Sequence, residues 1–154
     1  MVVATTYGSR MRKLITAQSM AGLAGVAFVV VGVAGFVPGV VQHYHELHWW
    51  KSGSGAELFG VFQTSILHNL VHLGFGAVGL LAAKTAVTAR AYLSGGGILY
   101  FTLGIYGLLI DRFGNSNVVP VDRADDWLHV GLGVAMIYAG LAVTLTALRP
   151  AGAS

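Results

Sequence analysis

Four apolar runs, separated by short segments that carry most of the charge, constrain this chain more than any other feature. Only 10% of its 154 residues are charged, whereas an ordinary soluble domain carries roughly 25%. Each run approaches the roughly 20 residues that a helix needs to cross the hydrocarbon core of a bilayer. Because so few charges cannot cover a soluble domain of this size, the sequence predicts a membrane protein.

The apolar runs predict four helices, at about 14–37, 62–83, 89–110 and 126–148. The expected fold class is all-α, a polytopic membrane four-helix bundle that forms one domain over residues 1–154. The first run is longer than the core of a cleavable signal peptide, which predicts a retained first helix. Residues 38–61 are expected to form an outer loop rich in histidine.

The basic residues predict the topology. Six of them fall at the termini and in the second loop, namely Arg10, Arg12, Lys13, Lys84, Arg90 and Arg149. The other two loops hold only Lys51, Arg112 and Arg123. By the positive-inside rule, the N- and C-termini are cytoplasmic, and we expect a multi-pass protein of the bacterial cytoplasmic (inner) membrane. The basic residues are too few and too scattered for a nucleic-acid interface, so no nucleic acid is expected as a partner.

Glycines recur at helical spacing on the predicted helices. In lipid there is little hydrophobic drive between helices, so close approach across small residues is a principal source of association. The glycines expected at helix contacts are Gly25, Gly32, Gly76, Gly104, Gly107 and Gly133. The motif His-x-Gly-x-Gly begins at His72 and again at His129, which suggests a repeat of two helical hairpins. Chance alignment in a chain with 22 glycines is the rival explanation.

Three histidines fall inside predicted membrane helices, where an ionisable ring is costly and marks packing or function. His68 and His72 lie one helical turn apart on one face. His129 follows Asp125 by four residues and Asp126 by three, so either carboxylate could orient its ring. Three interpretations remain open. The histidines could serve structural hydrogen bonding and helix packing, or they could bind a metal or a cofactor such as haem or another tetrapyrrole. They could also handle protons or substrate.

If a cofactor is bound between the two helices, the predicted depth of the histidines in the membrane favours His68 as the partner of His129. The shared His-x-Gly-x-Gly motif favours His72 instead. The chain contains no cysteine, which excludes disulfides and thiolate metal sites. A second histidine group, in the first outer loop, consists of His43, His45 and His48. Such a tract can gather zinc or copper through its imidazole nitrogens, and the alternative is a solvated loop without a ligand.

Segments 62–72, 90–97 and 119–129 resemble a bacterial, mainly actinobacterial, family of four-helix integral membrane proteins that is classified as a domain of unknown function. Leu-His-Asn-Leu-Val-His, ending at His72, and Trp-Leu-His, ending at His129, carry the resemblance most specifically. It extends over nearly everything from Gly32 to Gly140. The resemblance implies the four-helix fold and supports these histidines as family features, but it implies no activity. The first outer loop departs from the family pattern at His43–His45, which weakens the loop as a general metal site.

The expected function is that of a small non-enzymatic integral membrane protein, an accessory or scaffolding subunit of a larger assembly. Its partners would be the lipid bilayer and other membrane subunits or a second copy of the chain. No nucleophile arrangement with an orienting acid and an oxyanion site is identifiable, so no catalytic residue is assigned. One alternative is a haem- or tetrapyrrole-binding electron-transfer subunit that uses the intramembrane histidines. A second alternative is a small transporter or proton-conducting protein.

Overall fold

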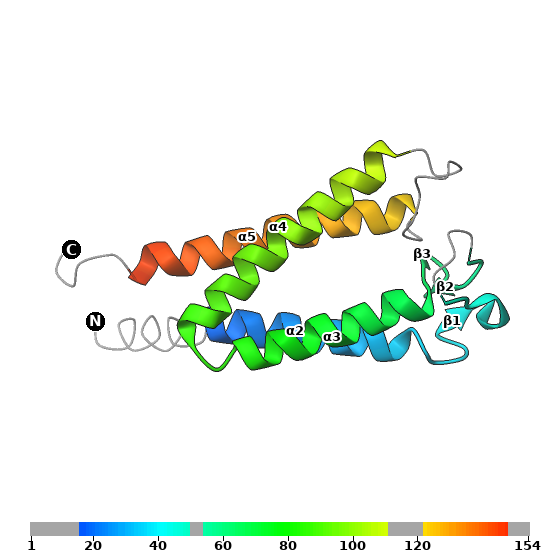
Figure 1. Ribbon diagram of the computed structural model, residues 1–154, viewed down its shortest axis with the longest axis horizontal. Helices are drawn as coiled ribbons and strands as arrows, with labels where there is room; N and C mark the ends of the chain where they lie inside the picture. Colours follow the sequence, from blue (N-terminus) through cyan, green and yellow to red (C-terminus); the bar gives the residue numbers. More distant parts are fainter. Residues whose placement is uncertain (1–15, 50–53, 111–121, 148–154) are drawn as a thin grey trace, which may run out of the picture.

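The computed structural model describes residues 16–49, 54–110 and 122–147, and this part of the chain is mostly helical. Its four helices are α2 (Ala17–Ala34), α3 (Ile66–Ala82), α4 (Ala86–Leu109) and α5 (Arg123–Ala147). α2 packs along α3, α4 packs along α5, and these two hairpins meet mainly through α2 and α4 (Figure 1). α2 and α4 run in one direction, whereas α3 and α5 run in the other, so the start of α2 and the end of α5 lie at the same end.

Each helix begins directly after a side chain that accepts a hydrogen bond from a backbone N–H three residues further on, the usual role of an N-cap. The four capping residues are Thr16, Ser65, Thr85 and Asp122. The expected starts at about 62, 89 and 126 lie within three or four residues of the observed starts at Ile66, Ala86 and Arg123, and the expected start at about 14 lies outside the described residues. The caps, rather than the edges of the apolar runs, fix the first turns. The expected end at residue 148 lies outside the described residues.

The segment between α2 and α3 contains a small sheet, so the mostly helical chain has three short strands where the sequence predicted an all-α fold with a histidine-rich loop over residues 38–61. Strands β1 (Val41–Gln42), β2 (Glu57–Leu58) and β3 (Phe62–Gln63) pair antiparallel in the order β1-β2-β3, and a short 3-10 helix, η1 (Tyr44–Glu46), follows β1. Phe62 and Gln63 pair with β2 and so cannot start α3. The sheet forms because Val41, Ala56 and Leu58 bury their side chains together.

This sheet connects the two hairpins at one end of the bundle. Residues Val31 and Ala34, at the end of α2, pack against its buried side chains. On the other side, the backbone N–H of Gln63 donates to the carboxylate of Asp122, the N-cap of α5, at 3.3 Å. The first turns of α3 and α5 are thereby held on either side of β3.

Glycines allow close approach within each hairpin, and the two hairpins use matching contacts. A Cβ placed on Gly25 of α2 would lie 2.9 Å from the carbonyl oxygen of Gly76 on α3. In the other hairpin, a Cβ on Gly97 of α4 would lie 2.8 Å from the carbonyl oxygen of Gly133 on α5. Only glycine fits at distances this short, because the neighbouring atoms are backbone.

The two hairpins also have equivalent glycine contacts nearer to the sheet. A Cβ on Gly32 would lie 2.9 Å from the carbonyl oxygen of Asn69, and one on Gly104 would lie 2.7 Å from that of Asp126. All six glycines expected at helix contacts are buried: Gly25, Gly32, Gly76, Gly104, Gly107 and Gly133. The two hairpins thus share one pattern of close contacts, in the same order along the chain.

Candidate functional site

The histidines of α3 and α5 lie in the first two turns of their helices, and the N-caps position them. The Ser65 hydroxyl accepts the backbone N–H of His68 at 3.1 Å, which places His68 in the first turn of α3 and His72 one turn later. In α5, the carboxylate of Asp122 accepts the N–H of Asp125 at 2.9 Å, and His129 follows one turn after Asp125. The sequence therefore delivers three imidazoles to the same end of the bundle from two helices.

The three rings converge. One nitrogen atom from each of His68, His72 and His129 lies within 4.8 Å of the others. The ring centroids of His68 and His72 are 4.5 Å apart, and those of His68 and His129 are 6.1 Å apart. His129 is only 7% exposed, and the other two residues are partly buried. The structure therefore brings both α3 histidines to His129, where the sequence left open which one would face it.

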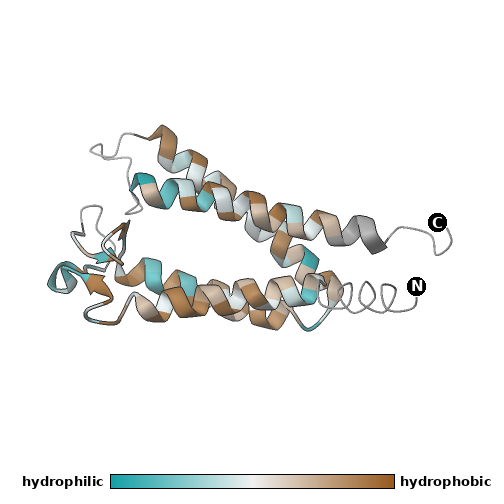
Figure 2. Ribbon diagram, turned by 180° about the vertical axis from the view of Figure 1, so that it is seen from behind, coloured by the Kyte–Doolittle hydropathy of each residue, from teal (hydrophilic) through white to brown (hydrophobic). Residues whose placement is uncertain are grey.

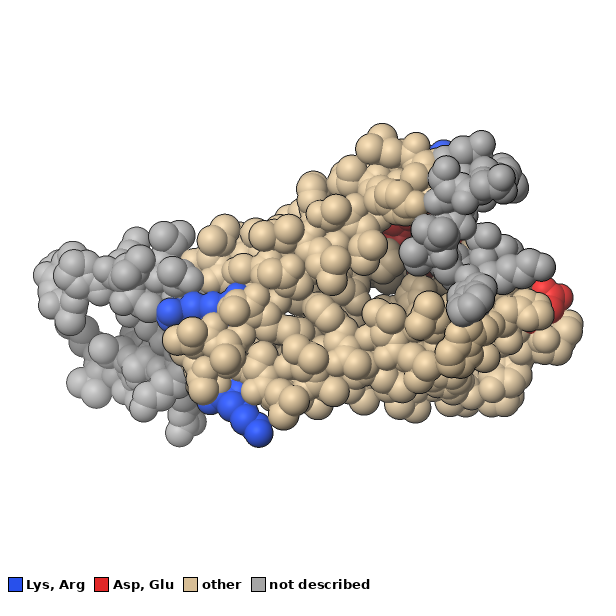
Figure 3. Space-filling view, in the orientation of Figure 1, with Lys and Arg blue, Asp and Glu red and all other residues tan. Residues whose placement is uncertain are grey.

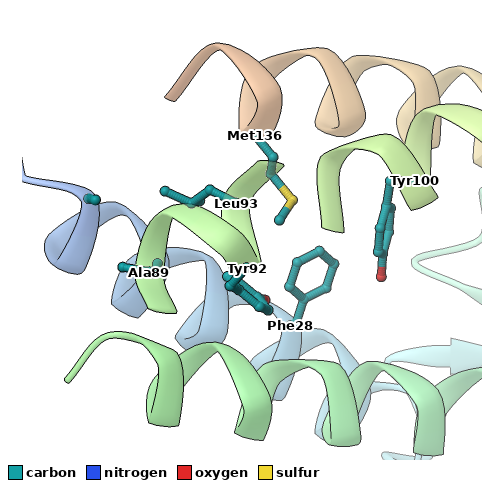
Figure 4. Close-up of a cluster of buried hydrophobic side chains, with 8 residues drawn as sticks. Phe28, Ala89, Tyr92, Leu93, Tyr100 and Met136 are labelled. Atoms are coloured by element: carbon teal, nitrogen blue, oxygen red, sulfur yellow. The ribbon is translucent and has the colours of Figure 1, made fainter. Parts of the chain in front are cut away.

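Aromatic side chains from α2 and α4 hold the rings of this cluster. The Phe28 ring stacks on His72 with centroids 5.7 Å apart and an interplanar angle of 18°, and the Tyr100 ring lies 5.2 Å from His129. Phe28 and Tyr100 themselves are 5.0 Å apart. Figure 4 shows both rings pointing from their helices into the space between the hairpins. The imidazoles of His72 and His129 are thus packed against aromatic rings.

Two buried polar side chains flank the cluster at matching positions, three residues before His72 and His129. Asn69 is 1% exposed, donates from its amide to the Gly35 carbonyl at 2.7 Å and accepts from the Thr64 hydroxyl at 2.6 Å. Asp126 is 0% exposed, and its carboxylate lies against Gly107 as the Asn69 amide lies against Gly35. Each hairpin therefore places one polar group against a glycine next to its histidine.

The sequence profile of one family, described as Domain of unknown function (DUF4383), matches residues 18–142, which include all of these positions. The chain belongs to the DUF4383 family. No curated protein and no solved structure matches it. The family assignment covers the fold and the histidine cluster together, so the cluster lies within the part of the chain that defines a DUF4383 domain.

The two acids expected to orient His129 take different positions in this DUF4383 chain. Asp125 forms a reciprocal pair with Asp122: each backbone N–H donates to the other's carboxylate, at 2.9 and 3.3 Å. This is the geometry of a capping box, and it directs the Asp125 carboxylate to the start of α5. Asp126 lies against Gly107. The Nδ1 atom of His129 is buried without a hydrogen-bond partner, so neither acid holds that nitrogen.

The loop histidines are not brought together. His43, His45 and His48 are all exposed, and His45 lies 3.4 Å from the carboxylate of Glu46. His43 adopts a left-handed backbone conformation, with φ of 51°, which turns the chain between β1 and η1. Among the described residues, the one group of three or more potential ligands with converging atoms is the cluster of His68, His72 and His129.

The tetrapyrrole hypothesis needs a flat slot beside these histidines, and aromatic rings fill the neighbouring space. Phe75 lies 5.0 Å from Phe28 and 5.1 Å from Tyr100, centroid to centroid. A macrocycle would have to displace these rings, whereas a single metal ion would not. Haem binding stays a prediction, which an absorption spectrum of the purified protein would test.

Sequence reasoning missed the aromatic partners, although the sequence contains a signal for them. Phe28 stands three residues after Gly25 and four before Gly32, and Tyr100 stands at the same distances from Gly97 and Gly104. Alignment of the two glycine patterns would have placed both rings at equivalent positions. Their contact with the histidines depends on how the hairpins pack on each other.

Proposed function

We propose that this chain is a multi-pass protein of the bacterial cytoplasmic membrane. The distribution of its side chains carries the proposal, because the described helices expose apolar residues and bury polar ones. Large apolar side chains with more than half of their surface exposed include Leu23, Val30, Leu81, Val87, Leu109 and Leu141. Thr64, Ser65, Asn69, Asp126 and His129 are buried. Water would favour the opposite arrangement, whereas lipid favours this one.

Helix length and charge support the same proposal. α2 and α4 are long and apolar enough to cross a membrane, and α3 is a shorter apolar helix. The hydropathic colouring of Figure 2 shows mainly apolar residues along the middle of the helices, with hydrophilic residues toward the sheet end and near the turn between α3 and α4. In Figure 3, lysine and arginine side chains gather mainly near the turn between α3 and α4, and acidic ones appear at the opposite end. The positive-inside rule then puts that turn, and with it both termini, in the cytoplasm.

The matching contacts of the hairpins support an origin by internal duplication. Gly25, Gly32 and Gly35 recur with the same spacing as Gly97, Gly104 and Gly107, and the contacts that they make recur as well. Parallel repeats of this kind are a known way to build membrane bundles. The sheet between α2 and α3 is then an insertion in the first repeat.

Within the membrane, we propose a non-enzymatic role as an accessory or scaffolding subunit of a larger assembly. No catalytic arrangement was identified in the sequence, and the exposed apolar faces of the described helices are suited to lipid and to other membrane helices. Its partners would be membrane subunits or a second copy of the chain.

Cysteine labelling tests the topology, since the natural chain has no cysteine. In intact cells, an impermeant maleimide should label a His45→Cys variant but should label Lys84→Cys only after the membrane is opened. Both side chains are exposed, so accessibility differs only by the side of the membrane. The protein should also stay in the membrane pellet at alkaline pH. Labelling of Lys84→Cys alone in intact cells, or release at alkaline pH, would contradict the proposed topology.

Photocrosslinking tests the accessory role. Leu109 is 80% exposed and Tyr138 is 72% exposed, on α4 and α5 respectively. A photoreactive amino acid at either position should give protein adducts of one or two discrete masses in native membranes. An adduct of twice the chain mass would identify a second copy as the partner. Adducts with lipid alone at both positions would refute the accessory role and leave the membrane topology unaffected.

A further inference from the structure

We propose that His68, His72 and His129 together bind one divalent transition-metal ion of the zinc and copper class. Their three nitrogen atoms already lie within 4.8 Å of one another. In a four-coordinate site with metal–nitrogen bonds of about 2.0–2.1 Å, ligand nitrogens lie roughly 3.4 Å apart. Small side-chain rotations close that difference. Such a site would give the interior of the bundle a metal-binding role beyond that of a scaffold.

Unsatisfied nitrogens distinguish this cluster from ordinary structural histidines. Buried polar atoms in proteins almost always have a hydrogen-bond partner, and exceptions require an explanation. The Nδ1 atoms of His72 and His129 are buried and have none. A metal ion bound through these Nδ1 atoms would supply the missing partner, and the proton of each ring would then lie on Nε2.

The three imidazole rings reach the site from two helices, α3 and α5. His68 and His72 project from successive turns of one helix, a spacing that lets two imidazoles reach the same ion. His129 approaches from α5, and the Phe28 and Tyr100 rings pack against His72 and His129. An ion bound here would join the two hairpins, so the free energy of unfolding should rise with the logarithm of the free ion concentration once that exceeds the Kd.

The ligand set determines the class of ion. Three neutral imidazoles suit zinc, copper, nickel and iron, whereas calcium and magnesium require oxygen ligands. The carboxylate of Asp125, one turn before His129, already pairs with the backbone of Asp122. Three protein ligands leave a fourth position for water or a small ligand, as in metal sites that exchange or react.

Zinc binding to the purified full-length protein in detergent, after removal of metal with a chelator, tests the inference. Equilibrium dialysis against Zn²⁺ should give one ion per chain, and Zn²⁺ should raise the Tm. His72→Ala and His129→Ala should each weaken binding by more than the roughly 10–100-fold that loss of an outer-shell partner costs. The matched control replaces the exposed loop residues His43, His45 and His48 with alanine together, and it should bind Zn²⁺ as the natural protein does.

Cu²⁺ electron paramagnetic resonance on the natural sequence provides a test that needs no core variant to fold. The spectrum of one bound Cu²⁺ should show coupling to three imidazole nitrogens, and the loop triple variant should give the same spectrum. Binding lost in the loop variant but kept in His72→Ala would overturn the proposal. Absence of stoichiometric Zn²⁺ binding, or a Cu²⁺ spectrum with oxygen ligands or a single nitrogen, would overturn it as well.

Discussion

Leucine in place of Gly76 or Gly133 should break the packing of one hairpin, whereas leucine in place of Gly74 or Gly131 should be tolerated. The two members of each pair stand in the same His-x-Gly-x-Gly motif, two residues apart. A Cβ on Gly76 would lie 2.7 Å from the carbonyl oxygen of Gly25. Nothing lies within 4 Å of a Cβ on either Gly74 or Gly131.

Leucine at Gly76 or Gly133 should lower the stability strongly, because backbone atoms of the neighbouring helix occupy the space that the side chain needs. Overpacking among flexible side chains costs about 1–3 kcal/mol, since the neighbours can shift. Here a Cβ on Gly133 would lie 2.5 Å from the backbone nitrogen of Phe101, so the helices themselves must separate. We expect loss of more than about 3 kcal/mol of stability, or failure to fold. Leucine at Gly74 or Gly131 should be neutral or slightly stabilising, because the helix propensity of leucine exceeds that of glycine by up to about 1 kcal/mol.

Thermal unfolding in detergent, with all four single variants compared to the natural protein, measures this contrast. We expect a low Tm or aggregation for the Gly76 and Gly133 variants and a near-natural Tm for the Gly74 and Gly131 variants. If all four variants unfold at the same temperature, the helices do not approach each other at Gly76 and Gly133.

Much of the helical fold could be predicted because helix packing follows local periodicity. The spacing of Gly25, Gly32, Gly104 and Gly107 identified faces that the structure buries. Helix boundaries were less accurate, since a single capping hydroxyl or carboxylate decides them and apolar runs extend past it. The small sheet was missed because each strand has only two residues, too few for an alternating pattern. Its stability comes from contacts with the end of α2, which no local pattern reveals.

The interior position of the histidines could be predicted, because it also follows from local helical periodicity. Helical spacing put the histidines on faces shared with small residues, which predicted an interior position. Which of His68 and His72 meets His129 depends on the rotation and depth of α3 relative to α5, and these follow from long-range packing. The positions of Phe28 and Tyr100 against the histidines depend on the contact between hairpins for the same reason.

The meeting of the two hairpins at their histidines is the central feature of this account, and a cysteine pair tests it in native membranes. The natural chain has no cysteine, so a His72→Cys/His129→Cys double variant contains the only two thiols. The matched control is Val71→Cys/Leu128→Cys, which shifts both thiols by one residue to positions that are 55% and 44% exposed.

A short thiol-specific bifunctional reagent should bridge the first pair within one chain, because the two imidazoles come within 4.8 Å. The control pair faces outward from two helices and should take up two separate reagent molecules. Intact-mass spectrometry distinguishes one bridging reagent from two separate ones. We expect a bridge in His72→Cys/His129→Cys and none in the control. A bridge only in the control, or none in either variant, would contradict it.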